Sequence, residues 1–183
     1  MSEPRLALYT FGQFVAPYES EQIKGFRDAE PHVFETIGNA SGFLGRSGYD
    51  DDVDPPSWGE QVFPRYWQDN GDGWAPSTLS LWKNFEAALA ACYHGLHGQA
   101  LKRGREWNVK PDGWPNYVAW WVADDHRPDW SEAVSRLEHL GDHGPSPKAF
   151  TLKSVFGPDG QPARVDTGKV KRLAAVNAAR AEG

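Results

Sequence analysis

The sequence has a single cysteine, Cys92, among its 183 residues, so no disulfide can form within the chain. It lacks an apolar run of about 18 residues, the length that a membrane-spanning helix needs, and no basic segment followed by an apolar one opens it. Its net charge of −6 argues against nucleic acid and against an anionic membrane as partners. We therefore expect a soluble, cytoplasmic protein with neither kind of partner.

Several motifs that carry chemistry are missing as well. Neither the serine-nucleophile pattern Gly-x-Ser-x-Gly nor the haem-attachment pattern Cys-x-x-Cys-His occurs. The acidic run 50–54 lacks the Gly and Glu spacing of a calcium loop. His94 and His97 have the spacing of a metal-binding pair, but no third ligand follows at a fixed spacing. We therefore expect no metal and no cofactor, with a haem held by His97 or His126 as the alternative.

Aromatic residues are what the sequence has in abundance: nine Trp, nine Phe and six Tyr. Each brings a large apolar area that must be buried. Nine tryptophans exceed what a small core usually needs, so two interpretations stay open. The protein has either a Trp-rich core or aromatic side chains that also line a cavity or a subunit contact.

Four short apolar segments lack helical spacing and are predicted to be β-strands. They span 6–11, 43–49, 78–82 and 116–122. In the first and the last, both alternating sets of side chains are apolar, which is typical of strands covered on both faces.

Helical spacing of apolar residues predicts long helices over 19–39 and 85–105. Pro31 lacks a backbone donor, so we expect a break or kink near it. A shorter helix is predicted to begin after Asp129, because Asp129 and Glu132 have the spacing of a capping box. The order β-α-β-β-α-β is that of the ferredoxin-like split βαβ fold, an α+β sheet with its helices on one face.

Composition divides the chain into a domain and a tail. Residues 1–156 are predicted to form one ferredoxin-like α+β domain. It is interrupted by an aromatic-rich loop insertion at 50–76, which folds back on the domain, and Trp67 lies in this loop. Residues 157–183, rich in Gly, Pro, Ala and charge, are predicted to be a loosely ordered tail or a short helix.

Strands that are apolar on both faces have a consequence for assembly. The split βαβ fold covers one face of its sheet with helices and leaves the other bare. A second copy of the same sheet is the simplest cover for that face. The sequence therefore predicts a homodimer in the form of a dimeric α/β barrel.

Motifs at matching spacing make the chain resemble a known family. They include Gly42-Phe43 with Arg46, Leu79-Ser80-Leu81-Trp82, Tyr93-x-x-x-His97, Trp120-Trp121-Val122, His126-Arg127-Pro128 and His143-Gly144-Pro145-Ser146-Pro147. The family is that of domain of unknown function 3291. The resemblance implies a dimeric α/β-barrel scaffold, in a superfamily that contains cofactor-free monooxygenases, muconolactone-type isomerases and haem enzymes.

Three residues are predicted to be catalytic. Tyr93 and His97 are one helical turn apart and so lie on the same side of their helix. A neutral imidazole accepts a proton near neutral pH, so we predict that His97 is the acid/base. Tyr93 and Arg46 would polarise a substrate oxygen. The alternative is that Tyr93 and His97 are core residues whose polar ends are satisfied.

The substrate site is predicted to be lined by aromatic side chains and by a histidine at the end of a strand. Aromatic rings suit a flat, apolar ligand. We also weigh the alternatives that Trp120 and Trp121 lie on opposite sheet faces and that His126 belongs to a solvated turn. The predicted set is Trp82, Trp120, Trp121, His126, Trp67 and Phe85.

Together these features favour a small biosynthetic or catabolic enzyme. Its substrate would be a hydrophobic, aromatic or polyketide-like small molecule. Histidine acid/base chemistry would isomerise, cyclise or oxygenate it without a cofactor. The alternatives are a haem-dependent enzyme on the same scaffold and a non-catalytic small-molecule binding protein.

Overall fold

A four-stranded antiparallel sheet is the centre of the protein. The computed structural model describes residues 3–181, apart from the side chains at 95–97 and 101. The strands lie in the order β2-β3-β1-β4, and their neighbours all run antiparallel. The mixed class and the antiparallel sheet predicted from the sequence are thereby confirmed. The strands are β1 (Arg5–Phe11), β2 (Phe43–Arg46), β3 (Ser77–Trp82) and β4 (Tyr117–Val122).

The helices follow the strands as β-α-β-β-α-β, with α2 and α3 together in the second helical position. A single 3-10 turn, η1 (Glu21–Ile23), leads into α1. α1 continues through Pro31, so the predicted break is wrong, while the alternative of a kink stays a prediction. The helices are α1 (Lys24–Gly38), α2 (Phe85–Tyr93), α3 (Gly95–Trp107), α4 (Trp130–His143) and α5 (Thr167–Ala181).

The long helix predicted over 85–105 is instead two helices. Asn84 caps the first by accepting a hydrogen bond from the Ala87 backbone N–H at 3.0 Å. His94 has an extended backbone, φ −122° and ψ 162°, and separates α2 from α3. A Cβ at Gly98 would lie 2.6 Å from the Tyr93 carbonyl oxygen, so the close approach of the two helices requires glycine there. The apolar stripe continues from α2 into α3, so the sequence pattern did not reveal the break at His94.

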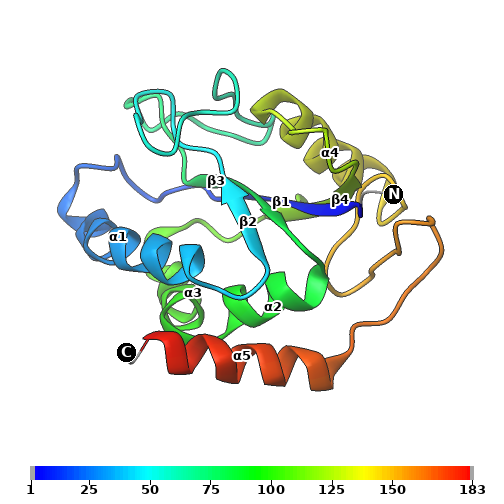
Figure 1. Ribbon diagram of the computed structural model, residues 1–183. Helices are drawn as coiled ribbons and strands as arrows, with labels where there is room; N and C mark the ends of the chain where they lie inside the picture. Colours follow the sequence, from blue (N-terminus) through cyan, green and yellow to red (C-terminus); the bar gives the residue numbers. More distant parts are fainter. Residues whose placement is uncertain (1–2, 182–183) are drawn as a thin grey trace.

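The sheet has two faces because side chains alternate along each strand. We call the face that bears Leu6, Leu8 and Thr10 the crossover face, since α1, α2 and α3 cross over it. The opposite face bears Ala7, Tyr9 and Phe11 and packs against α4, so we call it the α4 face. Figure 1 shows α4 on one side of the sheet and the other helices on the opposite side.

The expectation that all helices lie on one face is therefore wrong. α4 buries Trp130, Ala133, Leu137 and Leu140 on the α4 face. The irregular segment 49–75 also packs on that face, with four partly buried aromatic side chains, Tyr49, Phe63, Tyr66 and Trp67. Trp114, on the approach to β4, adds a fifth.

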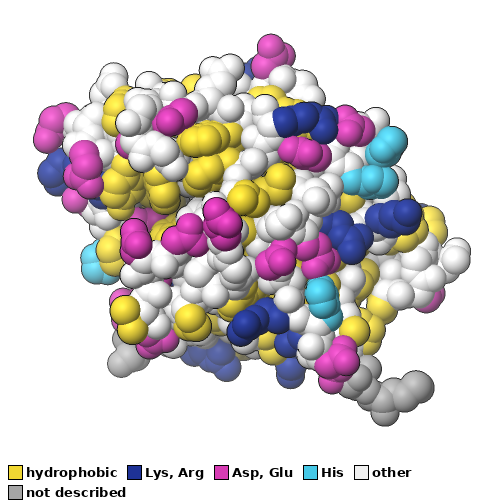
Figure 2. All heavy atoms as spheres, turned by 90° about the horizontal axis from the view of Figure 1, so that it is seen from above, with side chains coloured by type: hydrophobic (Ala, Val, Ile, Leu, Met, Phe, Trp, Pro, Cys, Tyr) yellow, Lys and Arg dark blue, Asp and Glu magenta, His cyan; other side chains and the backbone are white. Residues whose placement is uncertain are grey.

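The chain thus supplies its own cover for the face that was expected to be bare. Arg65 joins the irregular segment to α4 through its backbone N–H, which donates to Glu138 Oε1 at 2.7 Å. Figure 2 looks down on this side and shows charged side chains interspersed among hydrophobic ones. The bare face was the reason for expecting a homodimer, so that reason no longer holds and the homodimer stays a prediction.

The C-terminal segment packs on the outside of α2. Phe150 extends the sheet beyond β4 by exchanging two backbone hydrogen bonds with Ala119. Glu86 of α2 is buried and accepts hydrogen bonds from the Asp166 backbone N–H at 3.1 Å and from Lys169 Nζ at 3.3 Å. These contacts hold α5 against α2. Among the described residues, no helix combines the length and the apolar character needed to span a membrane.

Candidate functional site

A cavity forms on the crossover face because side-chain size falls along the strands. At one end of this face, Leu6 lies between Trp82 and Trp121, and α2 packs against these large residues. Two positions further along, the cross-strand rows become Ser80–Leu8–Ala119 and then Thr78–Thr10–Tyr117. Small side chains leave space beneath the helices, and a cavity of about 580 Å³ lies there.

This main cavity has the size and the lining of a small-molecule site. Such sites are usually about 300–1,000 Å³, mostly apolar, with a few polar groups. The sheet provides the floor, and α1 and α3 provide the walls. The apolar lining includes Leu8, Phe26, Val33, Phe34, Ile37, Trp82 and Trp107. A smaller cavity of about 220 Å³ shares Val33, Ala100 and Trp107 with it.

Most polar groups on the floor bind each other. The Thr10 and Thr78 hydroxyls are hydrogen-bonded at 2.6 Å, and Trp82 Nε1 donates to Ser80 Oγ at 2.9 Å. Asn108 also lines the cavity, and its Nδ2 donates to the Gly104 carbonyl at 3.1 Å. Its buried Oδ1 has no hydrogen-bond partner in the described part of the chain.

The main cavity also contains a carboxylic acid, Glu30, on α1. Its Oε2 accepts a hydrogen bond from the Tyr18 hydroxyl and its Oε1 accepts one from the Tyr49 hydroxyl, both at 3.2 Å. Burial raises the pKa of Glu30 above its ordinary value, and the two tyrosine hydrogen bonds and the Arg46 charge partly oppose this shift. Burial, together with the Glu30 charge, also raises the pKa of Tyr49 well above its ordinary value.

Arg46 reaches this acid from β2. Its guanidinium carbon lies 3.9 Å from the centre of the Phe34 ring, a cation–π contact, and its Nη1 donates to the Ser47 carbonyl at 3.1 Å. Phe34 is one helical turn beyond Glu30 on α1, so the guanidinium and the carboxyl lie near each other. Arg46, Glu30 and Tyr49 together make one polar end of the cavity, beside the β2 edge of the sheet.

Tyr93 and Cys92 line the opposite side, near β4. Tyr93 is 49% exposed. The pKa of its phenol is raised mainly by partial burial and, to a smaller extent, by the neighbouring Tyr117. Burial raises the pKa of the Cys92 thiol to about 12, so it stays protonated at neutral pH. The predicted acid/base, His97, has a side chain outside the described residues.

Of the predicted site residues, Arg46, Tyr93 and Trp82 line the main cavity. Trp121 of β4 is on the same sheet face, but its ring centre lies 6.0 Å from that of Phe85 of α2, so this pair packs between the sheet and α2 instead. Trp120 and Trp67 lie on the α4 face, on the other side of the sheet. Trp120 and Trp121 therefore do occupy opposite faces.

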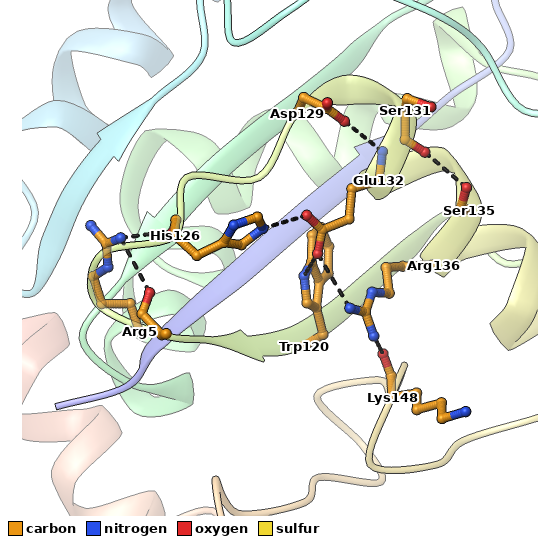
Figure 3. A network of polar contacts seen from close by, with 10 residues as sticks. Arg5, Trp120, His126, Asp129, Ser131, Glu132, Ser135, Arg136 and Lys148 are labelled. Atoms are coloured by element: carbon orange, nitrogen blue, oxygen red, sulfur yellow. Dashed lines mark hydrogen bonds and ion pairs between the residues drawn. The ribbon is translucent and has the colours of Figure 1, made fainter.

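His126 belongs to a surface network at the start of α4 (Figure 3). Its Nε2 lies 2.6 Å from Glu132 Oε2, while Glu132 Oε1 accepts from Trp120 Nε1 at 3.0 Å. The predicted N-cap is confirmed, because Asp129 Oδ1 accepts from the Glu132 backbone N–H at 2.7 Å. The Glu132 side chain does not complete a capping box, since it turns toward Trp120, His126 and Arg136.

Glu30, the acid at the polar end of the cavity, was not predicted from the sequence, although its position in a helix pattern could have indicated it. The apolar stripe of α1 runs through Phe26, Val33 and Ile37, and Glu30 occupies the stripe position between the first two. A carboxyl in an apolar stripe is costly to bury unless it is hydrogen-bonded or protonated, so it marks a candidate functional group. Tyr18 and Tyr49, which bind it, come from loops and carry no such pattern.

Comparison with known proteins identifies the family. The family model described as Domain of unknown function (DUF3291) matches residues 5–166, which is most of the chain. This confirms the family that the sequence motifs predict. Among curated proteins, none is significantly similar to the chain.

Proposed function

The chain belongs to the family Domain of unknown function (DUF3291), and we propose that it is an enzyme acting on a hydrophobic small molecule held in the main cavity. The substrate is flat and apolar over most of its length, aromatic or polyketide-like, and its oxygen faces Arg46 and Glu30. The apolar walls and the single polar end support this orientation.

One observation carries the proposal: a partly buried carboxyl with a raised pKa lies in a cavity of ligand size. Buried acids of this kind concentrate at catalytic sites, because a pKa nearer to neutral suits proton transfer. Glu30 therefore joins His97, Tyr93 and Arg46 as a candidate for acid/base chemistry. Isomerisation, cyclisation and oxygenation without a cofactor all begin with a proton transfer beside an oxygen.

Binding is tested by filling the cavity. Val33→Trp adds a large side chain to the wall that α1 contributes, whereas Val176→Trp makes the same change at an exposed position of α5. We expect a panel of phenols and aromatic ketones to quench tryptophan fluorescence in the wild type and in Val176→Trp. Val33→Trp should lose this response at least about tenfold, since the added indole occupies space between α1 and the sheet where the ligand would lie.

Catalysis is tested on the compounds that bind. Mass spectrometry after long incubation should find a changed product, and Glu30→Gln should slow its formation by about 100-fold or more, the usual contribution of an acid or base. A non-catalytic binding protein would return every ligand unchanged, and that outcome would refute the enzyme proposal. Haemin titration followed by Soret absorption tests the absence of a cofactor, and light scattering tests the homodimer.

A further inference from the structure

The polar end of the main cavity holds one carboxyl, Glu30, and one partly buried cation, Arg46. The groups that act on Glu30 are Tyr18 from the loop before η1, Tyr49 and Arg46 from the region of β2, and Asp52 from the loop that follows, which is exposed and therefore screened by solvent. Arg46 is the one cation among them. Arg105 and Lys110 also line the cavity but are exposed to solvent, where their charges are screened.

One guanidinium in a partly buried site can balance one negative charge well, but a second anion beside it raises the energy of both. In the empty cavity that anion is the Glu30 carboxylate. An anionic ligand that occupies the same end competes for Arg46. The least costly arrangement is then a neutral Glu30, which becomes a hydrogen-bond donor, and a ligand anion paired with Arg46.

We propose that the main cavity selects hydrophobic anions, such as aryl carboxylates, phenolates and enolates, and that Glu30 takes up a proton when such an anion binds beside Arg46. The inference rests on the proposed function in so far as a hydrophobic molecule must enter this cavity. It adds the charge of the substrate and the group that carries the proton.

Tyr49 connects this proton to the cavity, because its hydroxyl is bound to Glu30 Oε1 and its side chain lines the space. Where the bound oxygen is more basic than Glu30, the carboxyl O–H bond breaks as a new O–H bond forms on Tyr49. The original Tyr49 proton moves to the ligand oxygen in the same step. Glu30 is left as a carboxylate beside Arg46, the ligand is neutral, and no oxidant or reductant is needed.

Isothermal titration calorimetry with 1-naphthoate measures this proton uptake. Titrations from pH 5 to 8, in pairs of buffers with different ionisation enthalpies, give the number of protons bound with each ligand. We expect uptake to rise toward about one proton per 1-naphthoate at pH values where the free Glu30 is ionised. The neutral analogue 1-naphthamide, of nearly the same shape, should bind without uptake.

Two variants assign the proton. Glu30→Gln should bind 1-naphthoate with no uptake, while Glu35→Gln, the same change at an exposed position of α1, should behave as the wild type. Tyr49→Phe removes a donor from the carboxylate and so raises the pKa of Glu30, which should move the pH range of uptake upward. This second variant keeps the test available if Glu30→Gln does not fold.

The outcomes separate the two proposals. Binding of 1-naphthoate without proton uptake, or with the same uptake in Glu30→Gln, overturns the role of Glu30 and leaves the cavity as a ligand site. Failure of both naphthalene probes to bind the wild type, with no difference in Val33→Trp, overturns the proposed function as well.

Discussion

The two faces of the sheet are both buried, and they are filled differently. On the α4 face, Tyr9, Phe11 and Trp120 meet Trp130 and Leu137, and large side chains fill the layer. On the crossover face, the strands carry Thr10, Thr78 and Ser80 beneath α1 and α3, and the main cavity lies above them. The same strands thus build a packed layer on one side and a ligand-sized cavity on the other, through the sizes of alternate residues.

Removal of the central aromatic residue of the α4 face should have the largest effect on stability. Trp130 is fully buried, contacts Tyr9 edge-on and donates from Nε1 to Ser57 Oγ at 3.1 Å. Trp130→Ala should lower the free energy of unfolding by about 3–5 kcal/mol, because it leaves a cavity and removes the hydrogen bond to Ser57 Oγ. Urea denaturation measures the change, and a loss below about 1 kcal/mol would contradict a packed layer here.

A matched pair of leucines sharpens the comparison between the faces. Leu79 is fully buried on the α4 face, and Leu8 borders the main cavity on the crossover face. Leu79→Ala should cost about 4 kcal/mol and Leu8→Ala about 2 kcal/mol, the upper and lower parts of the usual range, because Leu8 already lacks contacts on its cavity side. Equal losses in urea denaturation would argue that the cavity is closed by repacking.

The smallest expected effect is the pH dependence that Glu30 contributes. Burial raises its pKa in the folded state, so the folded protein binds this proton more tightly than the unfolded chain does. The resulting stabilisation is complete below the ordinary pKa of glutamic acid, about 4.3, and is lost as the pH rises through the folded-state pKa. Thermal unfolding between pH 4 and 8 should show this decline in the wild type.

Glu30→Gln isolates that contribution, because glutamine does not titrate. Relative to Glu30→Gln, the melting temperature of the wild type should fall as the pH rises from 4 to 8. Glu35→Gln, which changes an exposed acid on the same helix, serves as the control. A pH-independent difference would mean that Glu30 has the same pKa in the folded and unfolded states.

The comparison of faces also explains how far the sequence could be interpreted. Short apolar runs without helical spacing predicted the strands, and the apolar character of Leu6, Leu8, Tyr9 and Trp120 correctly indicated that both faces are covered. It did not say what covers them. A strand pattern reports the burial of a face, and it does not identify α4 and the segment 49–75 as the elements that provide the cover. The homodimer was inferred to cover the second face, but α4 and the segment 49–75 of the same chain already pack on it.

Local signals were therefore readable in the sequence: the short apolar strand segments, the cap at Asp129 and the family motifs all depend on residues close together in the chain. The candidate site was only partly readable, because Arg46 and Tyr93 were identified but Glu30 and Tyr49 were not. The tertiary structure decided that α1, β2 and a loop meet around one carboxyl. Such a meeting depends on packing between distant segments, which no local pattern encodes.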